Sequence, residues 1–143
     1  GADNGVVTYM NPRYRSRISF TDAAGPIAAG AYQYTGQWAG DTNEGVYYTR
    51  HVIPSAGVLR RLHVQTSQAP GAGQLYTFQL KVNGATSSLT TTIANTSQAN
   101  ADTTNSVVVA ASDYITLLTH VHTGATGINA LVAAVEYEIT EPF

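Results

Sequence analysis

Strict alternation of apolar and polar side chains limits the fold of this sequence more than any other feature. In YTFQLKV (residues 76–82), the apolar residues occupy every second position: Tyr76, Phe78, Leu80 and Val82. Side chains two residues apart point to the same side of a β-strand, so this segment predicts a strand with one buried face. Asn83-Gly84 follows directly. Both central residues of a type I′ turn need positive φ, so this dipeptide predicts a tight hairpin.

The period of two recurs along most of the chain. It predicts further strands near residues 6–10, 13–20, 31–35, 45–53, 57–66, 87–94, 106–110, 113–122 and 130–139. Loops are expected where Gly, Pro, Ser, Asn and Asp cluster, including the long stretch ANTSQANADTTN (residues 94–105). No stretch has a helical period with caps. The pattern predicts an all-β protein, an antiparallel β-sandwich of the jelly-roll type.

The length of 143 residues fits a single domain. Residues 1–25 carry an Arg-rich strand and end in an Ala/Gly-rich link, so we expect an N-terminal arm, followed by the sandwich over residues 26–143. Cysteine is absent, which excludes disulfides and thiolate chemistry. No apolar run approaches the roughly 18–20 residues that span a bilayer, and no signal peptide is recognisable, so no membrane association is expected.

Charge is sparse and unevenly distributed. Charged residues make up 11% of the chain, against roughly 25% in an average soluble domain. Such a neutral polar surface favours an extracellular or particle-bound protein. The formal net charge is −2, with six of the seven basic residues before position 62 and five of the nine acidic ones from Asp102 onward. A nucleic-acid binder would be basic overall, so no nucleic-acid partner is expected.

Two histidines one residue apart, in LLTHVHTG (residues 117–124), are the main candidate for a metal site. On a strand, His120 and His122 point the same way, roughly 6.5–7 Å apart, a spacing that can chelate one ion. Catalysis at one metal needs a third ligand, and a cupin supplies a Glu a few residues later. Here no carboxylate follows before Glu136. The pair therefore predicts a polar strand face, with two alternatives: a structural metal at the three-fold axis of a homotrimer, and a cupin-like metalloenzyme.

Arg13, Arg15 and Arg17 place three guanidinium groups on one face of the first strand. Guanidinium groups pair well with carboxylates and phosphates. The first interpretation is a solvated edge strand whose charges discourage aggregation. The second is a docking element for an acidic protein surface, such as the C-terminal EYEITEPF of another subunit.

Aromatic residues gather within seventeen residues of the first half of the chain: Tyr32, Tyr34, Trp38, Tyr47 and Tyr48. Such side chains stack on sugars or fill protein interfaces, so they are candidates for glycan or partner contact. The loop AGDTNEG (residues 39–45) offers oxygen ligands, but a calcium loop would carry more carboxylates, and an ordinary turn is expected.

The segment from residue 57 to residue 121 resembles a pattern that recurs in structural proteins of tailed-bacteriophage particles. Its motifs are an APGAG turn, the strand YTFQL, the Asn-Gly hairpin, a Thr-rich strand, a DTTN loop and the corner VVVAASDYITL. Ser112 stands in this corner where such motifs commonly have Gly, which implies a less tight turn. The resemblance carries no catalytic signature.

The resemblance implies a non-enzymatic virion protein without a cofactor, located on the surface of a phage particle. Proteins of this kind are typically homotrimeric jelly-roll modules of capsid decoration (cement) proteins, head fibres and tail fibres. The expected partner is therefore the major capsid protein or another virion protein. In tail fibres, His-x-His pairs point at the three-fold axis, which is what the resemblance implies for His120 and His122. A glycan- or receptor-binding module of a phage fibre is the alternative function.

Overall fold

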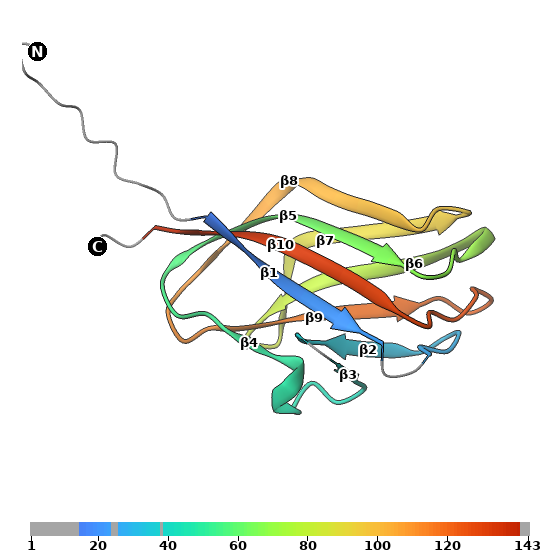
Figure 1. Ribbon diagram of the computed structural model, residues 1–143, viewed down its shortest axis with the longest axis horizontal. Helices are drawn as coiled ribbons and strands as arrows, with labels where there is room; N and C mark the ends of the chain where they lie inside the picture. The colour runs from blue at the N-terminus through green and yellow to red at the C-terminus, as the bar shows by residue number, and fades with distance from the viewer. Residues whose placement is uncertain (1–14, 24–25, 38, 141–143) are drawn as a thin grey trace, which may run out of the picture.

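The computed structural model describes residues 15–23, 26–37 and 39–140 (Figure 1). Nearly all regular structure in this part of the chain is β-strand, with one short 3-10 turn, η1 (Tyr47–Thr49). The strands are β1 (Arg15–Asp22), β2 (Tyr32–Thr35), β3 (Gly40–Asp41), β4 (His51–Val52), β5 (Gly57–Thr66), β6 (Gly71–Val82), β7 (Ala85–Asn95), β8 (Ala99–Val109), β9 (Tyr114–Val121) and β10 (Leu131–Ile139). No helix among the described residues is long and apolar enough to cross a membrane.

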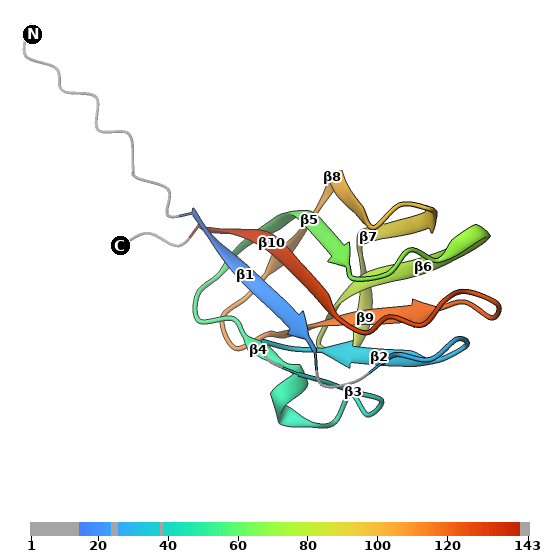
Figure 2. The same ribbon diagram turned by 45° about the vertical axis from the view of Figure 1, so that its right-hand side comes forward.

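The strands form two antiparallel sheets that face each other (Figures 1 and 2). The four-stranded sheet has the order β1-β10-β5-β8. The six-stranded sheet has the order β3-β2-β9-β6-β7, and β4 pairs with β9 beside the end of β2. The predicted antiparallel β-sandwich is confirmed.

The core lies between the sheets and follows the period of two. On β6, the predicted inward positions Tyr76, Phe78 and Leu80 are fully buried. From the opposite sheet, Leu59 of β5 and Val135 of β10 are fully buried as well. Burying a large apolar side chain stabilises a fold by about 1.5–3 kcal/mol, so these faces hold the two sheets together. The outer faces of the two sheets carry the candidate functional residues.

A β-bulge in β5 departs from simple alternation. Arg61 has a φ of 57°, and the pairing of β10 with β5 jumps from Ala134↔His63 to Glu136↔Arg60, which leaves one extra residue in β5. The pairing of β5 with β8 shifts at the same place, from Arg60↔Ser106 to Leu62↔Asp102, so β8 bulges there as well. A bulge inserts an extra residue, so both Arg60 and Arg61 carry their side chains away from the core while Leu59 and Leu62 are both buried. The bulge thus adds a second arginine to the outer face of the four-stranded sheet.

The Asn-Gly hairpin is confirmed. Asn83 and Gly84 have φ values of 51° and 81°, the positive pair that a type I′ turn requires, and they join β6 to β7 through the pair Val82↔Ala85. The turn aligns the two strands so that their apolar positions share the core face.

Two predicted segments were wrong in detail. Residues 45–53 do not form one strand: η1 interrupts them, because the Thr49 hydroxyl and backbone N–H both donate to the carbonyl of Val46. Only His51–Val52 remain extended in a sheet. The loop expected over residues 94–105 is much shorter, because β8 begins at Ala99 and its polar residues pair with β5.

The expected division at residue 25 does not match the arrangement of the strands. β1 pairs with β10 along its whole length, from Arg15↔Glu138 to Asp22↔Leu131, and Phe20 is fully buried. Residues 15–22 are therefore part of the sandwich rather than an arm in front of it. The strand expected at residues 6–10 lies outside the described residues.

Candidate functional site

His120, on β9, and His122, directly after the end of β9, lie on the outer face of the six-stranded sheet, as the alternation predicts. Their rings are in contact, with centroids 4.2 Å apart. Tyr32 of β2 stacks on the far side of His120, with centroids 3.9 Å apart and planes 5° from parallel. A hydrogen bond of 2.7 Å joins His122 Nε2 to the hydroxyl of Thr77 on β6. We call Tyr32, His120, His122 and Thr77 the ring row.

Strand register builds the ring row. β9 lies between β2 and β6, and His120 pairs with Tyr32 on one side and with Thr77 on the other. Directly opposed side chains on neighbouring strands lie close enough to touch. The row therefore runs across three neighbouring strands. The sequence showed the His pair but not its two neighbours, because register is a long-range property.

The arrangement assembles only two metal-ligating residues in this row. Among the described residues, no group of three His, Asp or Glu side chains is placed to hold a metal ion. His51, from β4, packs edge-on against Phe20 at 5.0 Å, and His63 lies on the other sheet. The third ligand of a cupin-like centre is thus not assembled within the described part of one chain.

Protonation of His120 is disfavoured. Partial burial lowers the pKa of His120 from its ordinary value of 6.5, and the neighbouring His122 lowers it further. Two imidazolium rings in contact would repel each other. Near neutral pH the ring of His120 is therefore mostly uncharged.

Within the described residues, the predicted aromatic residues come from two elements, β2 and η1. Tyr34 follows Tyr32 on the same face of β2, but its ring lies 5.1 Å from the ammonium of Lys81. Tyr47 and Tyr48 lie on η1 and are 83% and 51% exposed. Tyr48 donates a 2.6 Å hydrogen bond to Asp41, which raises the pKa of Tyr48 and lowers that of Asp41. Trp38 lies outside the described residues.

The loop AGDTNEG is an ordinary turn, as expected. Asp41 Oδ1 accepts the backbone N–H of Asn43, and Asn43 Oδ1 accepts that of Gly45, both at 2.8 Å. Glu44 instead forms a 2.9 Å ion pair with Lys81, and Arg50 lies 4.2 Å over the ring of Tyr114. These contacts fasten the segment between β3 and β4 to the outer face of the six-stranded sheet.

The arginine ladder is only partly within the described residues. Arg13 lies outside them, while Arg15 and Arg17 are exposed on β1. Arg15 Nε binds Glu138 Oε2 at 2.9 Å, and Arg60 binds the other oxygen of Glu138 at 3.3 Å. The acidic C-terminal strand, expected to meet the arginines of another subunit, pairs with arginines of its own chain.

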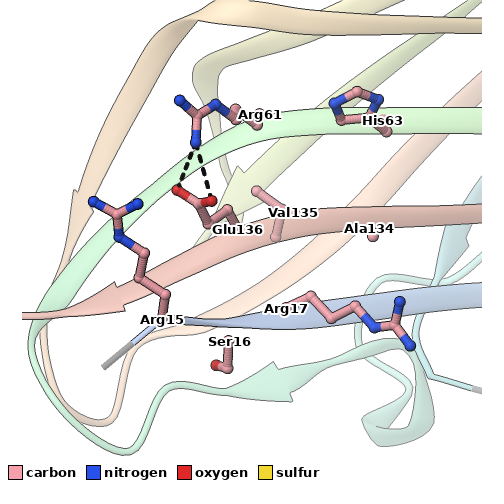
Figure 3. Close-up of a pocket in the computed structure, with 8 residues that line it drawn as sticks. All are labelled: Arg15, Ser16, Arg17, Arg61, His63, Ala134, Val135 and Glu136. Atoms are coloured by element: carbon pink, nitrogen blue, oxygen red, sulfur yellow. Dashed lines mark hydrogen bonds and ion pairs between the residues drawn. The ribbon is translucent and has the colours of Figure 1, made fainter. Parts of the chain in front are cut away.

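A hollow of about 500 Å³ lies on the outer face of the four-stranded sheet, across β1, β10 and β5 (Figure 3). We call it the arginine groove. The residues that line it are Arg15, Ser16, Arg17, Arg61, His63, Ala134, Val135 and Glu136. Its lining holds three arginines and one glutamate, a formal charge of +2 with His63 neutral.

Sequence reasoning missed the contribution of β5 to this groove. Arg61 binds both oxygens of Glu136, at 3.2 and 3.1 Å, and His63 follows two residues later on the same face. The one signal in the sequence was the pair Arg60-Arg61. In a regular strand, side chains alternate between the two faces, so one of two adjacent arginines would point into the core. A bulge resolves that conflict, and its presence brings Arg61 beside β10.

No protein-family model matches the chain, and no curated protein matches it either.

Proposed function

We propose that this chain is a non-enzymatic structural protein of a phage particle. It decorates or cements the capsid, or forms part of a head or tail fibre, through contacts with a major capsid protein or another virion protein. The resemblance of residues 57–121 to such proteins supports this proposal. So does the pairing order, in which β1-β10-β5-β8 faces β2-β9-β6-β7. This order supports the proposal that the sandwich is a jelly roll, an architecture used by viral capsid proteins, lectins and cupins.

The ring row is the observation that carries the proposal. Its members are held in place by stacking and by the hydrogen bond to Thr77, yet Tyr32 remains 53% exposed. Rigid aromatic side chains lose little conformational entropy when a partner covers them, which is why they are enriched in protein interfaces. A preorganised aromatic surface of this kind is suited to burial against another protein.

We further propose a homotrimer in which the ring rows meet near the three-fold axis. Three copies of His120 and His122 would then supply six imidazoles, enough for a structural metal ion without any carboxylate. The protein would act by surface burial: each contact with a neighbouring capsomer favours the assembled particle by mass action, and several contacts from one trimer reinforce one another.

Gold labelling tests the location. An antibody against the purified protein is applied to intact particles from the source of this sequence and viewed by electron microscopy. Labelled heads support capsid decoration or a head fibre, and labelled tails support a tail fibre. Intact particles that carry no label, although the protein is present in the lysate, would contradict the proposal.

Light scattering tests the trimer, with metal content measured on the same fraction. The expected mass is three times the 15.1 kDa of one chain. Tyr32→Glu should shift the protein toward monomer by placing a charge in the contact, whereas Tyr47→Glu on η1 should leave the mass unchanged. A monomer at every concentration, or equal effects of both variants, would contradict the trimer.

Glycan or receptor binding is the second candidate, and the exposure of three tyrosines favours it. Tyr47, Tyr32 and Tyr48 are each more than half exposed, and such rings stack on the apolar faces of sugars. A glycan array read with the wild type and with Tyr47→Ala separates this function from cementing. Saccharide-specific binding that the variant loses supports it; uniform background with both proteins argues against it.

A further inference from the structure

We propose that the arginine groove is a binding site for an extended acidic peptide of the partner protein, recognised through alternate Asp or Glu carboxylates. This inference rests on the proposed function and names the chemistry of the partner at a second surface, on the sheet opposite the ring row. Four observations carry it: the exposure of the groove's cations, the small side chain of Ala134 in its floor, the spacing of the arginines, and the place of the acids among them.

The cations of the groove keep exposed donors after their internal pairing. Arg15 uses Nε to bind Glu138, and Arg61 uses one terminal nitrogen to bind Glu136, yet these two side chains remain 55% and 52% exposed. Arg17 forms no ion pair with a described residue, and its guanidinium points away from Glu136 (Figure 3). A guanidinium has five N–H donors, so each arginine can hold a second carboxylate.

The floor of the groove is low where a ligand would enter. Ala134 of β10 lies between His63 on β5 and the strand β1, and it offers only a methyl group (Figure 3). Longer side chains stand on both sides of it. A carboxylate above Ala134 would find His63 on one flank and Arg17 on the other.

The spacing of the arginines selects an extended chain. Arg15 and Arg17 are two residues apart on β1, which separates them by about 6.6–7 Å. Alternate side chains of an extended peptide have the same repeat. A Glu-x-Glu segment running along β1 would therefore place one carboxylate beside each arginine, and charge-assisted pairs of this kind also fix register.

The acids of the groove argue against a polyanion such as nucleic acid. Glu136 lines the groove and Glu138 lies directly beneath Arg15, so β10 places two negative charges among the arginines. The side chain of Glu136 is 24% exposed, so a continuous phosphate backbone would meet its carboxylate, and the buried carboxylate of Glu138 would add to the repulsion. A peptide with acids at alternate positions can place its neutral residues over them, and the net charge of −2 on the whole chain disfavours nucleic acid further.

Peptide binding in solution tests the groove. The probes are a labelled, end-capped (Glu-Thr)3 peptide, the matching (Gln-Thr)3 peptide and a single-stranded dT6 oligonucleotide, titrated into the full chain and followed by NMR shifts and fluorescence anisotropy. We expect the Glu peptide alone to bind and to shift the amides of Arg15, Arg17, His63 and Ala134. The Arg17→Gln/His63→Gln double variant should raise the Kd about fivefold or more.

Matched variants guard against a general charge effect. Arg50→Gln removes one positive charge outside the groove and should leave the Kd unchanged. Ala134→Leu fills the floor without altering charge and should abolish binding, whereas Val132→Leu, on the same face of β10 but outside the groove, should not. Equal binding of the Gln peptide, preferential binding of dT6, or equal effects of Ala134→Leu and Val132→Leu would overturn the inference.

These outcomes separate the two proposals. If particles carry gold label but the Glu peptide fails to bind, only the groove assignment falls. If the peptide binds as expected but particles carry no label, the groove stands as an acidic-peptide site and the virion function falls.

Discussion

The ring of Tyr32 lies flat against the imidazole of His120, 3.9 Å between centroids and 5° from parallel, and this contact ties β2 to β9 on the outer face of the sheet. β2 has only four residues, so each cross-strand contact matters for holding it in place. The stacking should therefore contribute to the stability of the protein.

We predict a measurable coupling between these two rings. Stacked ring pairs are worth about 0.5–1.5 kcal/mol beyond their burial. In a double-mutant cycle of Tyr32→Ala and His120→Ala, urea unfolding should give a coupling free energy in that range. The pair Tyr47→Ala and His120→Ala serves as the control, because Tyr47 lies on η1, and its coupling should be near zero. Equal coupling for both pairs would contradict the prediction.

Acid should weaken the fold through His51. Burial lowers the pKa of His51 below its ordinary value of 6.5, and its Nε2 has no hydrogen-bond partner among the described residues. The unfolded chain therefore binds a proton at higher pH than the folded one. The stability that neutral His51 contributes is fully present above pH 6.5 and is lost as pH falls through the lower folded pKa. Partly buried His120, whose pKa is lowered too, adds loss in the same direction.

Thermal unfolding between pH 7.5 and pH 5 measures this effect. The wild type should lose stability steadily below pH 6.5, and His51→Leu should flatten that part of the curve. His63→Leu, at an exposed position on β5, should leave the slope as it is in the wild type. A slope unchanged by His51→Leu would show that other groups set the acid sensitivity.

Local pattern predicted the elements that depend on local chemistry. The predicted strand over residues 57–66 agrees with the bounds of β5. Asn83-Gly84 forms the predicted tight turn, with positive φ at both residues. The alternation also placed His120 and His122 correctly on the outer face. Each of these follows from neighbouring residues alone, which is the information that a single sequence holds.

Features set by distant pairing could not be predicted in the same way. The polar composition of residues 94–105 predicts a loop, yet β8 begins at Ala99, because the backbone groups there hydrogen-bond to β5. The arginine groove needs β1, β10 and β5 side by side, and Arg61 reaches it through a bulge. Tyr32 meets His120 only through the register of β2 on β9.

Asp102 should be important for stability at the point where β8 bulges. Burial would raise the pKa of this carboxyl, but hydrogen bonds from the side chain and backbone of Asn105 and from the backbone of Thr104 and Thr90 lower it to about 2. Asp102→Ala leaves these donors without their acceptor and should lower the free energy of unfolding by about 2–3 kcal/mol at pH 7.

The charge of Asp102 gives this prediction a pH signature. Its folded pKa of about 2 lies below the ordinary 3.8, so its contribution is present above pH 3.8 and is lost as pH falls through about 2. We expect the wild type and Asp102→Ala to differ less in their free energy of unfolding at pH 2 than at pH 7, as measured by urea unfolding. Asp41→Ala, in the exposed turn, should cost much less at pH 7. A difference that stays constant with pH would mean that packing, not the carboxylate, stabilises the bulge.

Ser112 occupies a backbone conformation that suits glycine better. Its φ is 73°, and its N–H donates to the carbonyl of Ile53 at 2.8 Å, so the corner before β9 is tight despite the side chain. A left-handed conformation costs a non-glycine residue about 1–2 kcal/mol, and the extra entropy of an unfolded glycine offsets about 0.5–1 kcal/mol of that. Ser112→Gly should therefore raise the free energy of unfolding by about 0.5–1 kcal/mol, and Ser112→Val should lower it.

The same Ser→Gly change at exposed Ser106, within β8 and without positive φ, should destabilise instead. Urea denaturation of the three variants decides the matter: a loss of stability in Ser112→Gly equal to that in Ser106→Gly would mean that the left-handed backbone carries no strain.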